Sequence, residues 1–287
     1  MKLNPAITGI NIQQGTSTRI VQHPLSSAEN WQAGPQEFSM QVPGVGDFYA
    51  KEGNYIEYFP VPGADPEWIK LYLNGQVLVA LLHQRKIINF HASSFVYDNL
   101  GVMILGETGA GKSSLTASFI LGGAGFLSDD LTPVFFRNDK PHIMALGRDI
   151  KLRANTVGQL NIGFENLKDA EAGTGKQYLQ MEKPYSADHP VDTIMKIEVD
   201  NVIAPEFYAP AASEKFTILR SEICLWEMLA GMPDTEAEYL QQLVKIVEQV
   251  KVVRVVRPVQ FEISALHDPV SEFLESGMET GGRRHER

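Results

Sequence analysis

The segment that decides the fold is residues 102–113, which read VMILGETGAGKS. It contains the pattern G-x-x-x-x-G-K-[ST], whose glycines allow backbone N–H groups to converge on phosphate oxygens. In this pattern the lysine reaches the β- and γ-phosphates of a nucleotide and the hydroxyl binds Mg²⁺. Lys112 and Ser113 occupy those two positions. The segment therefore predicts a nucleotide site, and we expect its ligands to be ATP and Mg²⁺.

The sequence on both sides of this loop supplies the strand and the helix that the pattern requires. Residues 101–105 form a short apolar run, as in a buried strand, and residues 113–121 place apolar side chains on one helical face. A helix that begins at the loop directs its positive dipole end at bound phosphate. We expect the nucleotide contacts to come from Gly106, Glu107, Thr108, Gly109, Ala110, Gly111, Lys112, Ser113 and Ser114.

A second glycine cluster, GTGKQ at residues 173–177, does not meet the pattern. Ala170 stands at the position of the first glycine, and Gln177 replaces the hydroxyl residue. The surrounding segment 165–186 is rich in Gly, Lys, Asp and Glu, which is typical either of a mobile flap or of a plain surface loop. If it is a flap, Lys176 and Lys183 are candidates for closing on nucleotide phosphates.

An acidic pair, Asp129 and Asp130, follows a short apolar run 17 residues after the loop lysine. In phosphoryl transfer one aspartate can hold Mg²⁺, and another can accept the proton of the attacking hydroxyl. A turn with two solvated aspartates is the alternative. We expect Ser113, Asp129 and Asp130 to be the metal ligands, and the sequence leaves open which aspartate is the base.

His91 is the third candidate for the chemistry. It lies in the run 87–95, which we expect to be a strand that leads into the strand of the loop. A histidine beside a carboxylate is held in one tautomer and can assist a base, whereas an isolated one is more often structural. Four cations follow the acidic pair and could stabilise transition-state charge or pair with surface acids: Arg137, Arg148, Lys151 and Arg153.

The N-terminal part of the chain predicts a small antiparallel sheet and a long helix. Residues 1–35 are polar and read as a loosely held arm or a lone edge strand. Short strands are expected at 38–42, 47–51 and 55–61. Asp65 as N-cap and Pro66 at the first helical position begin a helix that should run to about Arg85.

The C-terminal part alternates strands with helices. We expect strands at 193–199, 215–219 and 252–258, and helices at 221–230, 234–250 and 268–274. These boundaries divide the chain into an N-terminal arm, sheet and linking helix at 1–85, a catalytic domain at 86–275, and a disordered tail at 276–287.

Composition restricts the partners. The chain has 287 residues and a net charge of −10, and it has no basic run, so nucleic acid is not expected as a partner. Cys224 is the single cysteine, which excludes an intrachain disulfide and a multi-cysteine metal site. Because no signal-like h-region and no run of 18 apolar residues occur, we expect a cytoplasmic protein without membrane insertion. A homo-oligomeric assembly is left open.

Taken together, HASS at residues 91–94, the loop at 106–113 and SDD at 128–130 resemble the catalytic core of the HPr serine kinase/phosphorylase family. In that family a histidine likewise precedes the loop serine by 22 residues, and an Asp-Asp pair likewise follows it. A looser similarity to the family extends over about residues 38–262. The segment before this core, residues 63–85, is similar to the corresponding segment of shorter HPr-kinase-like bacterial proteins.

The resemblance implies an α/β fold of α+β character, with a strand-rich P-loop core of the HPr kinase and phosphoenolpyruvate carboxykinase type and a small N-terminal antiparallel sheet. It further implies Mg·ATP as donor and a protein or peptide serine as acceptor. By the resemblance, His91 assists and Asp129 or Asp130 performs proton abstraction, while Lys112 binds phosphate.

Two departures from that family bear on the substrate. Ser114 stands where the family carries a glutamate, and residues 146–153 match its acidic, glycine-containing signature poorly. HPr as substrate, phosphorolysis and a hexamer are therefore not carried over. The alternatives are a regulatory module in which ATP orders segment 165–186 for a partner, and a small-molecule kinase. A carboxykinase is less favoured because no arginine cluster for a carboxylic acid is evident.

Overall fold

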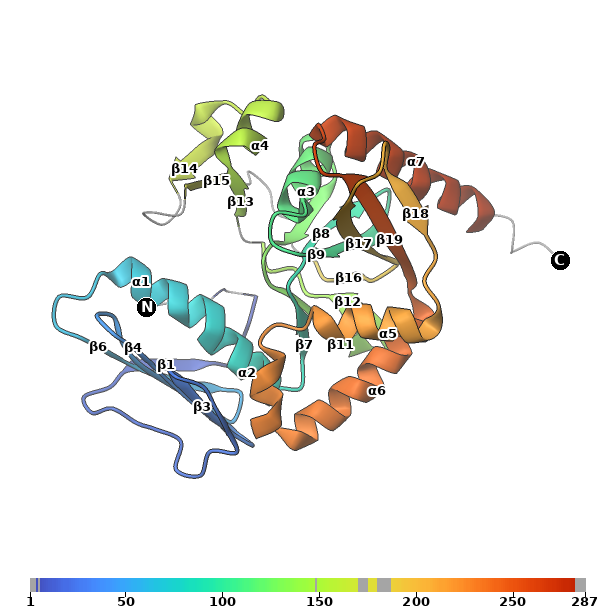
Figure 1. The fold of residues 1–287 in the computed structure, drawn as a ribbon. Helices are drawn as coiled ribbons and strands as arrows, with labels where there is room; N and C mark the ends of the chain where they lie inside the picture. The colour runs from blue at the N-terminus through green and yellow to red at the C-terminus, as the bar shows by residue number, and fades with distance from the viewer. Residues whose placement is uncertain (1–3, 5, 148, 170–174, 180–186, 282–287) are drawn as a thin grey trace.

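The protein mixes helices with several β-sheets, which confirms an α/β fold (Figure 1). The structure is a computed structural model that describes residues 4, 6–147, 149–169, 175–179 and 187–281. The N-terminal sheet lies to one side of a larger C-terminal part, and the kinked helix α1–α2 runs along it (Figure 1).

The N-terminal sheet has the strand order β1-β6-β5-β4-β3-β2. All its neighbours are antiparallel except β1 and β6. One face is buried by Phe38, Met40, Phe48 and Ile56. The strands are β1 (Asn11–Gln14), β2 (Ser26–Ser27), β3 (Trp31–Gly34), β4 (Glu37–Val42), β5 (Gly46–Lys51) and β6 (Tyr55–Pro60).

The predicted long helix covers this sheet, but it is interrupted. It consists of α1 (Pro66–Tyr72), a π-helical turn η1 (Leu73–Val77) and α2 (Leu78–Gln84). The side chain of Asp65 accepts from the backbone N–H of Glu67, as expected of an N-cap. Gly75 has non-helical dihedral angles, which accounts for the kink. Leu73, Val77, Leu78 and Leu81 pack against the sheet in one core.

The central sheet of the C-terminal part positions the predicted site. Its order is β10-β8-β9-β17-β19-β18, and β9, β17 and β19 run parallel. Ligands of such sheets bind at the carboxyl ends of the parallel strands. The strands are β8 (Ser93–Tyr97), β9 (Leu100–Gly106), β10 (Gly125–Ser128), β17 (Thr193–Asp200), β18 (Glu206–Tyr208) and β19 (Lys251–Pro258).

Helices cover both faces of this sheet because its central strands are apolar on both sides. Val102 and Ile104 face α3 (Lys112–Leu121) and α7 (Ile263–Gly281). Met103 and Leu105 face α5 (Ala212–Ser221), α6 (Pro233–Gln249) and a smaller sheet. That sheet has the order β16-β12-β11-β7, formed by β7 (Ile88–Phe90), β11 (Thr132–Arg137), β12 (Lys140–Ile143) and β16 (His189–Pro190).

A fourth, three-stranded sheet stands beside α3 with a short helix (Figure 1). It consists of β13 (Ile150–Arg153), β15 (Lys176–Leu179) and β14 (Leu167–Asp169), with α4 (Ala154–Gln159) after β13 and the 3-10 turn η2 (Phe164–Asn166) before β14. Ile150, Leu152 and Leu179 pack with Ala117 and Phe126 in a separate core. Two described parts of segment 165–186, residues 167–169 and 176–179, therefore belong to a sheet, and Lys183 lies outside the described residues.

At three places the secondary structure differs from the one that the sequence predicts. Residues 11–34 supply three strands rather than a loose arm or one edge strand, because Trp31 and Ala33 are buried in the N-terminal core. Residues 215–219 are helical in α5, because Ile218 and Leu219 are buried on one helical face despite their β-branched neighbours. The helix expected at 221–230 is the end of α5 followed by the 3-10 helix η3 (Trp226–Gly231).

The C-terminal helix is longer than the residues 268–274 that the sequence predicts. It begins at Ile263 and continues to Gly281, so residues 276–281 of the expected tail are helical. The apolar side chains of Leu266, Val270 and Leu274 pack on the central sheet, and Leu266 lies in the part of the helix that precedes residue 268. The boundary at residue 85 stays a prediction, since Met228 and Met232 also contribute to the N-terminal core.

Within the part of the chain that the structure describes, no helix combines the length and the apolar composition needed to cross a bilayer.

Candidate functional site

The glycine loop, residues 106–113, connects β9 to α3 as its pattern predicts. Gly106 has φ of 148°, and a Cβ there would approach the carbonyl oxygen of Ile197 to 2.7 Å. Gly111 caps α3 with φ of 109°. Both conformations favour glycine. The loop thus leaves the carboxyl edge of the parallel strands, with the N-terminus of a ten-residue helix behind it.

Lys112 lies folded under this loop. Its ammonium group donates to the carbonyl oxygen of Gly106 at 2.6 Å and lies 3.4 Å from that of Glu107. The side chain is buried, and burial lowers the pKa of Lys112. The lysine therefore contacts the backbone of the loop itself.

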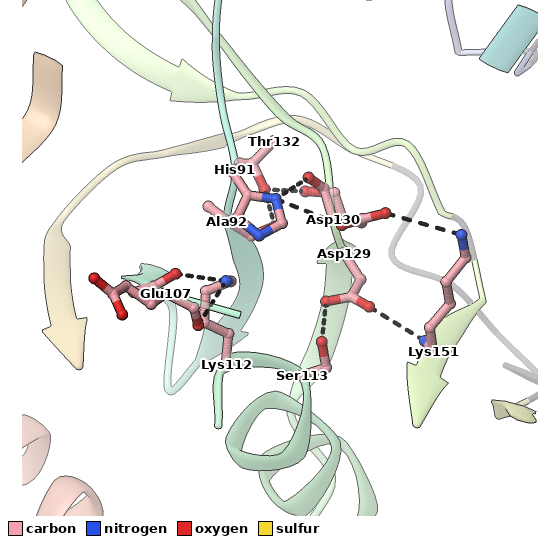
Figure 2. Close-up of polar contacts among 11 residues, drawn as sticks. His91, Ala92, Glu107, Lys112, Ser113, Asp129, Asp130, Thr132 and Lys151 are labelled. Atoms are coloured by element: carbon pink, nitrogen blue, oxygen red, sulfur yellow. Dashed lines mark hydrogen bonds and ion pairs between the residues drawn. The ribbon is translucent and has the colours of Figure 1, made fainter. Parts of the chain in front are cut away.

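Ser113 and Asp129 meet directly. The Ser113 hydroxyl donates to Asp129 Oδ1 at 2.9 Å, and the backbone N–H of Lys151 donates to Asp129 Oδ2 at 3.2 Å (Figure 2). Asp129 is only 4% exposed, and this burial raises its pKa. The predicted spacing of 17 residues therefore joins the end of β10 to the first turn of α3.

Asp130 points the other way, towards His91 and Lys151 (Figure 2). His91 Nδ1 lies 3.2 Å from the carbonyl oxygen of Asp130 and 3.5 Å from its Oδ1. Lys151 Nζ lies 3.9 Å from Asp130 Oδ2. Since both atoms near Nδ1 can only accept, Nδ1 carries the hydrogen and Nε2 of the neutral ring is an acceptor. Asp130 adopts φ of 69°, a left-handed conformation that separates its side chain from that of Asp129.

The prediction that His91 lies inside a strand is wrong. β7 ends at Phe90 and β8 begins at Ser93, and the two strands belong to different sheets. The chain has to change sheets between them, and the N–H of His91 donates to the carbonyl oxygen of Glu222 rather than to a neighbouring strand. This break places the imidazole beside Asp130 at the edge of the cavity.

Buried hydroxyl groups form a chain of hydrogen bonds between residues that flank the acidic pair. Ser94 Oγ lies 2.7 Å from Ser128 Oγ, which lies 2.8 Å from Thr132 Oγ1, and Thr132 donates to the carbonyl oxygen of Ala92 at 3.1 Å. These contacts link the residues on both sides of the acidic pair to the residue after His91. These contacts cannot be predicted from the sequence, since serine and threonine have no spacing that would mark such a chain.

Arg257, at the end of β19, is a site residue that the sequence analysis missed. Its guanidinium donates to the carbonyl oxygens of Ala110 at 2.8 Å and Gly109 at 3.1 Å, and it lies 3.8 Å from the centre of the Phe261 ring. The side chain is 4% exposed, and burial lowers its pKa. The only available signal was an arginine directly before Pro258 at the end of an apolar strand. Arg257 thus holds two carbonyl groups of the loop backbone.

These groups open onto a cavity of about 1180 Å³. Of the predicted residues, His91, both aspartates and most of the loop and its first helical turn line it, whereas Gly106 and Ala110 do not. Lys151, Arg153 and Lys176 line it, while Arg137 pairs elsewhere with Asp188 at 3.1 Å. Arg148 lies outside the described residues. Ser114 also lines it, and its hydroxyl lies 2.9 Å from Thr156 Oγ1 on α4.

The chemistry of the donors fits a magnesium ion bound together with a nucleotide. Ser113 Oγ and Asp129 are oxygen donors beside the glycine loop, and Mg²⁺ commonly takes one or two carboxylates together with waters and substrate phosphates. Among the described residues no three His, Cys, Asp or Glu side chains form a preformed metal site. The buried charge of Asp129 is a group that such an ion would neutralise.

Among known proteins, the chain has similarity to solved structures only. Searches find no matching family model and no matching curated protein. Among solved structures, the chain is similar to the HPr(Ser) kinase/phosphatase of Coxiella burnetii, with 13% identity and a TM-score of 0.36 over 68% of this chain and 98% of that one. A likeness of this size is too slight to assign an activity to this chain.

Proposed function

We propose that this protein transfers the γ-phosphoryl group of ATP, in the presence of Mg²⁺, to a hydroxyl group, that of a serine in a protein or peptide. The observation that carries the proposal is the contact of Ser113 with Asp129 at 2.9 Å, with the His91–Asp130 pair directly beside it. Metal-binding oxygens and a proton acceptor thus stand next to each other at the mouth of the glycine loop.

The loop and its lysine would hold the phosphates. Loop N–H groups and the N-terminus of α3 supply partial positive charge, and Lys112 supplies a full one. Mg²⁺, when bound, neutralises charge on the β- and γ-phosphates. Ser113 and Asp129 would hold that ion, because both are oxygen donors at the start of α3 and Asp129 is shielded from water. Arg257 would keep the loop backbone in its binding conformation.

Asp130 is the better candidate for the base. It is 57% exposed on its side chain, whereas Asp129 is buried against Ser113. An incoming hydroxyl can reach Asp130, and its proton would pass to that carboxylate as the oxygen attacks phosphorus. His91 would hold the carboxylate through its Nδ1–H, and Lys151 would hold the second oxygen. The two aspartates then have separate roles, one towards the metal and one towards the acceptor.

The competing hypothesis is a regulatory module that binds nucleotide without transferring phosphate. Both hypotheses require Lys112 to bind the nucleotide. Only phosphate transfer requires Asp130 as a base. A small-molecule kinase would require both residues but would label a low-molecular-weight product.

The test is phosphate transfer from γ-labelled ATP with Mg²⁺ in a host lysate. We expect the native chain to label an acceptor, and Lys112→Ala and Asp130→Asn each to abolish the label. The separation of the products by size distinguishes a protein acceptor from a small one. If the native chain binds Mg·ATP but no label moves, the regulatory module replaces the kinase.

A further inference from the structure

One wall of the cavity consists of apolar side chains that water can reach. Residues 203–205, which follow β17, and residues 258–263, which follow β19, line the cavity together. Ile203 is fully exposed and Val259 is 67% exposed, while Phe261 is half-buried. We call Ile203, Pro205, Val259 and Phe261 the apolar wall. Exposed apolar side chains that gather on one surface mark a site of binding.

The apolar wall is joined to the glycine loop through Arg257. The guanidinium of Arg257 lies 3.8 Å from the centre of the Phe261 ring and also donates to two carbonyl groups of the loop. A Cβ placed on Gly111 would lie 3.4 Å from Cζ of Phe261. The ring therefore lies beside the start of α3, where we expect phosphate to bind. A ligand that occupies both places must combine phosphate with an apolar part.

Polar groups line the cavity next to the apolar wall. Asn155 and Gln159 on α4 line it, as does Gln260 after β19. The Oε1 atom of Gln159 accepts from the backbone N–H of Ile263 at 3.0 Å, which holds α4 to the first turn of α7. A nucleobase is flat and apolar on its faces and has donors and acceptors along its edge. An apolar wall with a few amide groups beside it suits such a molecule.

The central sheet places the apolar wall and the acidic pair on different sides of the loop strand. In the order β10-β8-β9-β17-β19, β10 leads to Asp129 and Asp130, β9 leads to the glycine loop, and β19 leads to the apolar wall. In phosphoryl transfer the attacking and leaving oxygens lie roughly in line on either side of phosphorus. A hydroxyl that approaches from Asp130 therefore directs the leaving diphosphate, with its nucleoside, away from β10 and towards β19.

We propose that the apolar wall binds the nucleoside of ATP, with the base lying against Phe261. This inference rests on the function proposed above and specifies how its nucleotide is recognised. An aromatic ring offers a base a large contact area, because every base has an aromatic face. Since Arg257 contacts both this ring and the loop, the base and the phosphates are held by adjoining parts of one site.

The experiment compares a non-hydrolysable ATP analogue with tripolyphosphate, which has three phosphates and no nucleoside. Each is titrated into the full chain with Mg²⁺ by calorimetry. We expect the analogue to bind about tenfold more tightly, as one stacked base contributes an effect of that order. Tripolyphosphate carries at least as much negative charge as ATP, so a preference for the analogue must come from contacts with the nucleoside. Equal affinities, or tighter binding of tripolyphosphate, would overturn the proposal.

Variants locate the contact. Phe261→Ala should lower the affinity for the analogue about tenfold and leave that for tripolyphosphate unchanged, whereas Phe261→Tyr keeps an aromatic face and should bind like the native chain. Val259→Ser, at an exposed position, should cause a smaller loss of roughly threefold. Val244→Ser on α6 is the matched control, because Val244 is also exposed but does not line the cavity. It should bind both ligands like the native chain.

The two ligands separate this inference from the proposed function. If neither binds, the phosphate site is absent and both proposals fail. If Phe261→Ala binds the analogue like the native chain, or loses affinity for both ligands equally, the ring does not contact the base and this inference alone fails. If the analogue is preferred and Phe261→Ala removes the preference, but no acceptor is ever labelled, the nucleoside site stands and the kinase proposal fails.

Discussion

The hydroxyl of Ser113 donates a 2.9 Å hydrogen bond to the buried carboxylate of Asp129. The two residues come from different elements, the first turn of α3 and the end of β10, and are 16 positions apart in the chain. In the proposed function these two oxygen donors would hold the magnesium ion. The contact connects the glycine loop to the acidic pair.

Ser113→Ala should weaken Mg²⁺-dependent nucleotide binding. The variant removes one proposed metal ligand and leaves Asp129 with one donor fewer, at a cost of about 1.5–3 kcal/mol for a hydrogen bond to a charged group. That corresponds to roughly a 10- to 100-fold loss of Mg·ATP affinity, measured by titration calorimetry. Ser113→Thr is the matched control and should restore binding. An alanine variant with native Mg·ATP affinity would exclude Ser113 as a metal ligand.

Asp129→Asn should stabilise the metal-free protein and abolish its stabilisation by Mg·ATP. Burial raises the pKa of Asp129 above its ordinary value of 3.8, so the native state binds more protons than the unfolded state just above pH 3.8. Stability therefore falls as pH rises through that window, and the cost persists at neutral pH. The asparagine has no such charge. Urea unfolding at pH 7, with and without Mg·ATP, measures both effects.

The reverse result is equally informative. If Asp129→Asn lowers the free energy of unfolding in metal-free buffer, the hydrogen bonds from Ser113 and Lys151 outweigh the buried charge. If the variant keeps its stabilisation by Mg·ATP, the ion is held elsewhere.

Asp130→Asn should keep nucleotide affinity and lose transfer. The side chain is exposed and does not contact Ser113, so Mg·ATP binding should change little. Loss of a general base typically costs a factor of 10² to 10⁴, and we expect a fall of about that size in kcat. Single-turnover transfer from labelled ATP measures it. Native transfer by this variant would show that Asp130 is not the base.

The sequence predicted the parts of the site that depend on one short pattern. The strand, loop and helix around residues 106–113 lie where the pattern requires, because glycine conformations and apolar runs are local properties. The position of Asp129 beside the loop also agrees with the prediction, because the 17 residues from Lys112 cover helix α3, a turn and strand β10. The different orientations of Asp129 and Asp130 were not predictable, because they depend on the left-handed backbone at Asp130.

The features that the sequence analysis did not predict depend on tertiary contacts. Arg257 lies 145 positions after Lys112 and reaches the loop only because β19 and β9 both neighbour β17. The strand predicted over His91 failed for a related reason, since two different sheets share that run of apolar residues. The helix at 215–219 was read as a strand because its β-branched residues carry a local preference that packing overrides.

Arg257→Lys should weaken nucleotide binding without removing a charge. Lysine cannot reproduce the planar fork that donates to Gly109 and Ala110, so carbonyl groups of the loop lose their partners. The expected cost is about 1–3 kcal/mol, with a fall in nucleotide affinity of roughly tenfold. Arg254→Lys on the same strand is the control, because Arg254 pairs with Glu198 and Glu214 instead. Equal effects of the two substitutions would contradict a specific role for Arg257.

His83 should make the native protein sensitive to mild acid. Its Nε2–H donates to the carbonyl oxygen of Cys224, its Nδ1 lies 3.0 Å from the Tyr239 hydroxyl, and burial lowers its pKa to about 4. Between that value and the ordinary 6.5, the unfolded state binds the proton and the native state does not, so stability falls as pH drops through this window. The full effect is at most roughly 3 kcal/mol.

The measurement is urea unfolding of the native chain and His83→Gln between pH 7 and pH 4. At pH 7 the native chain should be the more stable, because glutamine cannot keep both contacts of the imidazole. Its advantage should then shrink steadily as pH falls towards 4, since only the native chain has a buried imidazole to protonate. A constant difference across this range would mean that the pKa of His83 is not lowered in the folded protein.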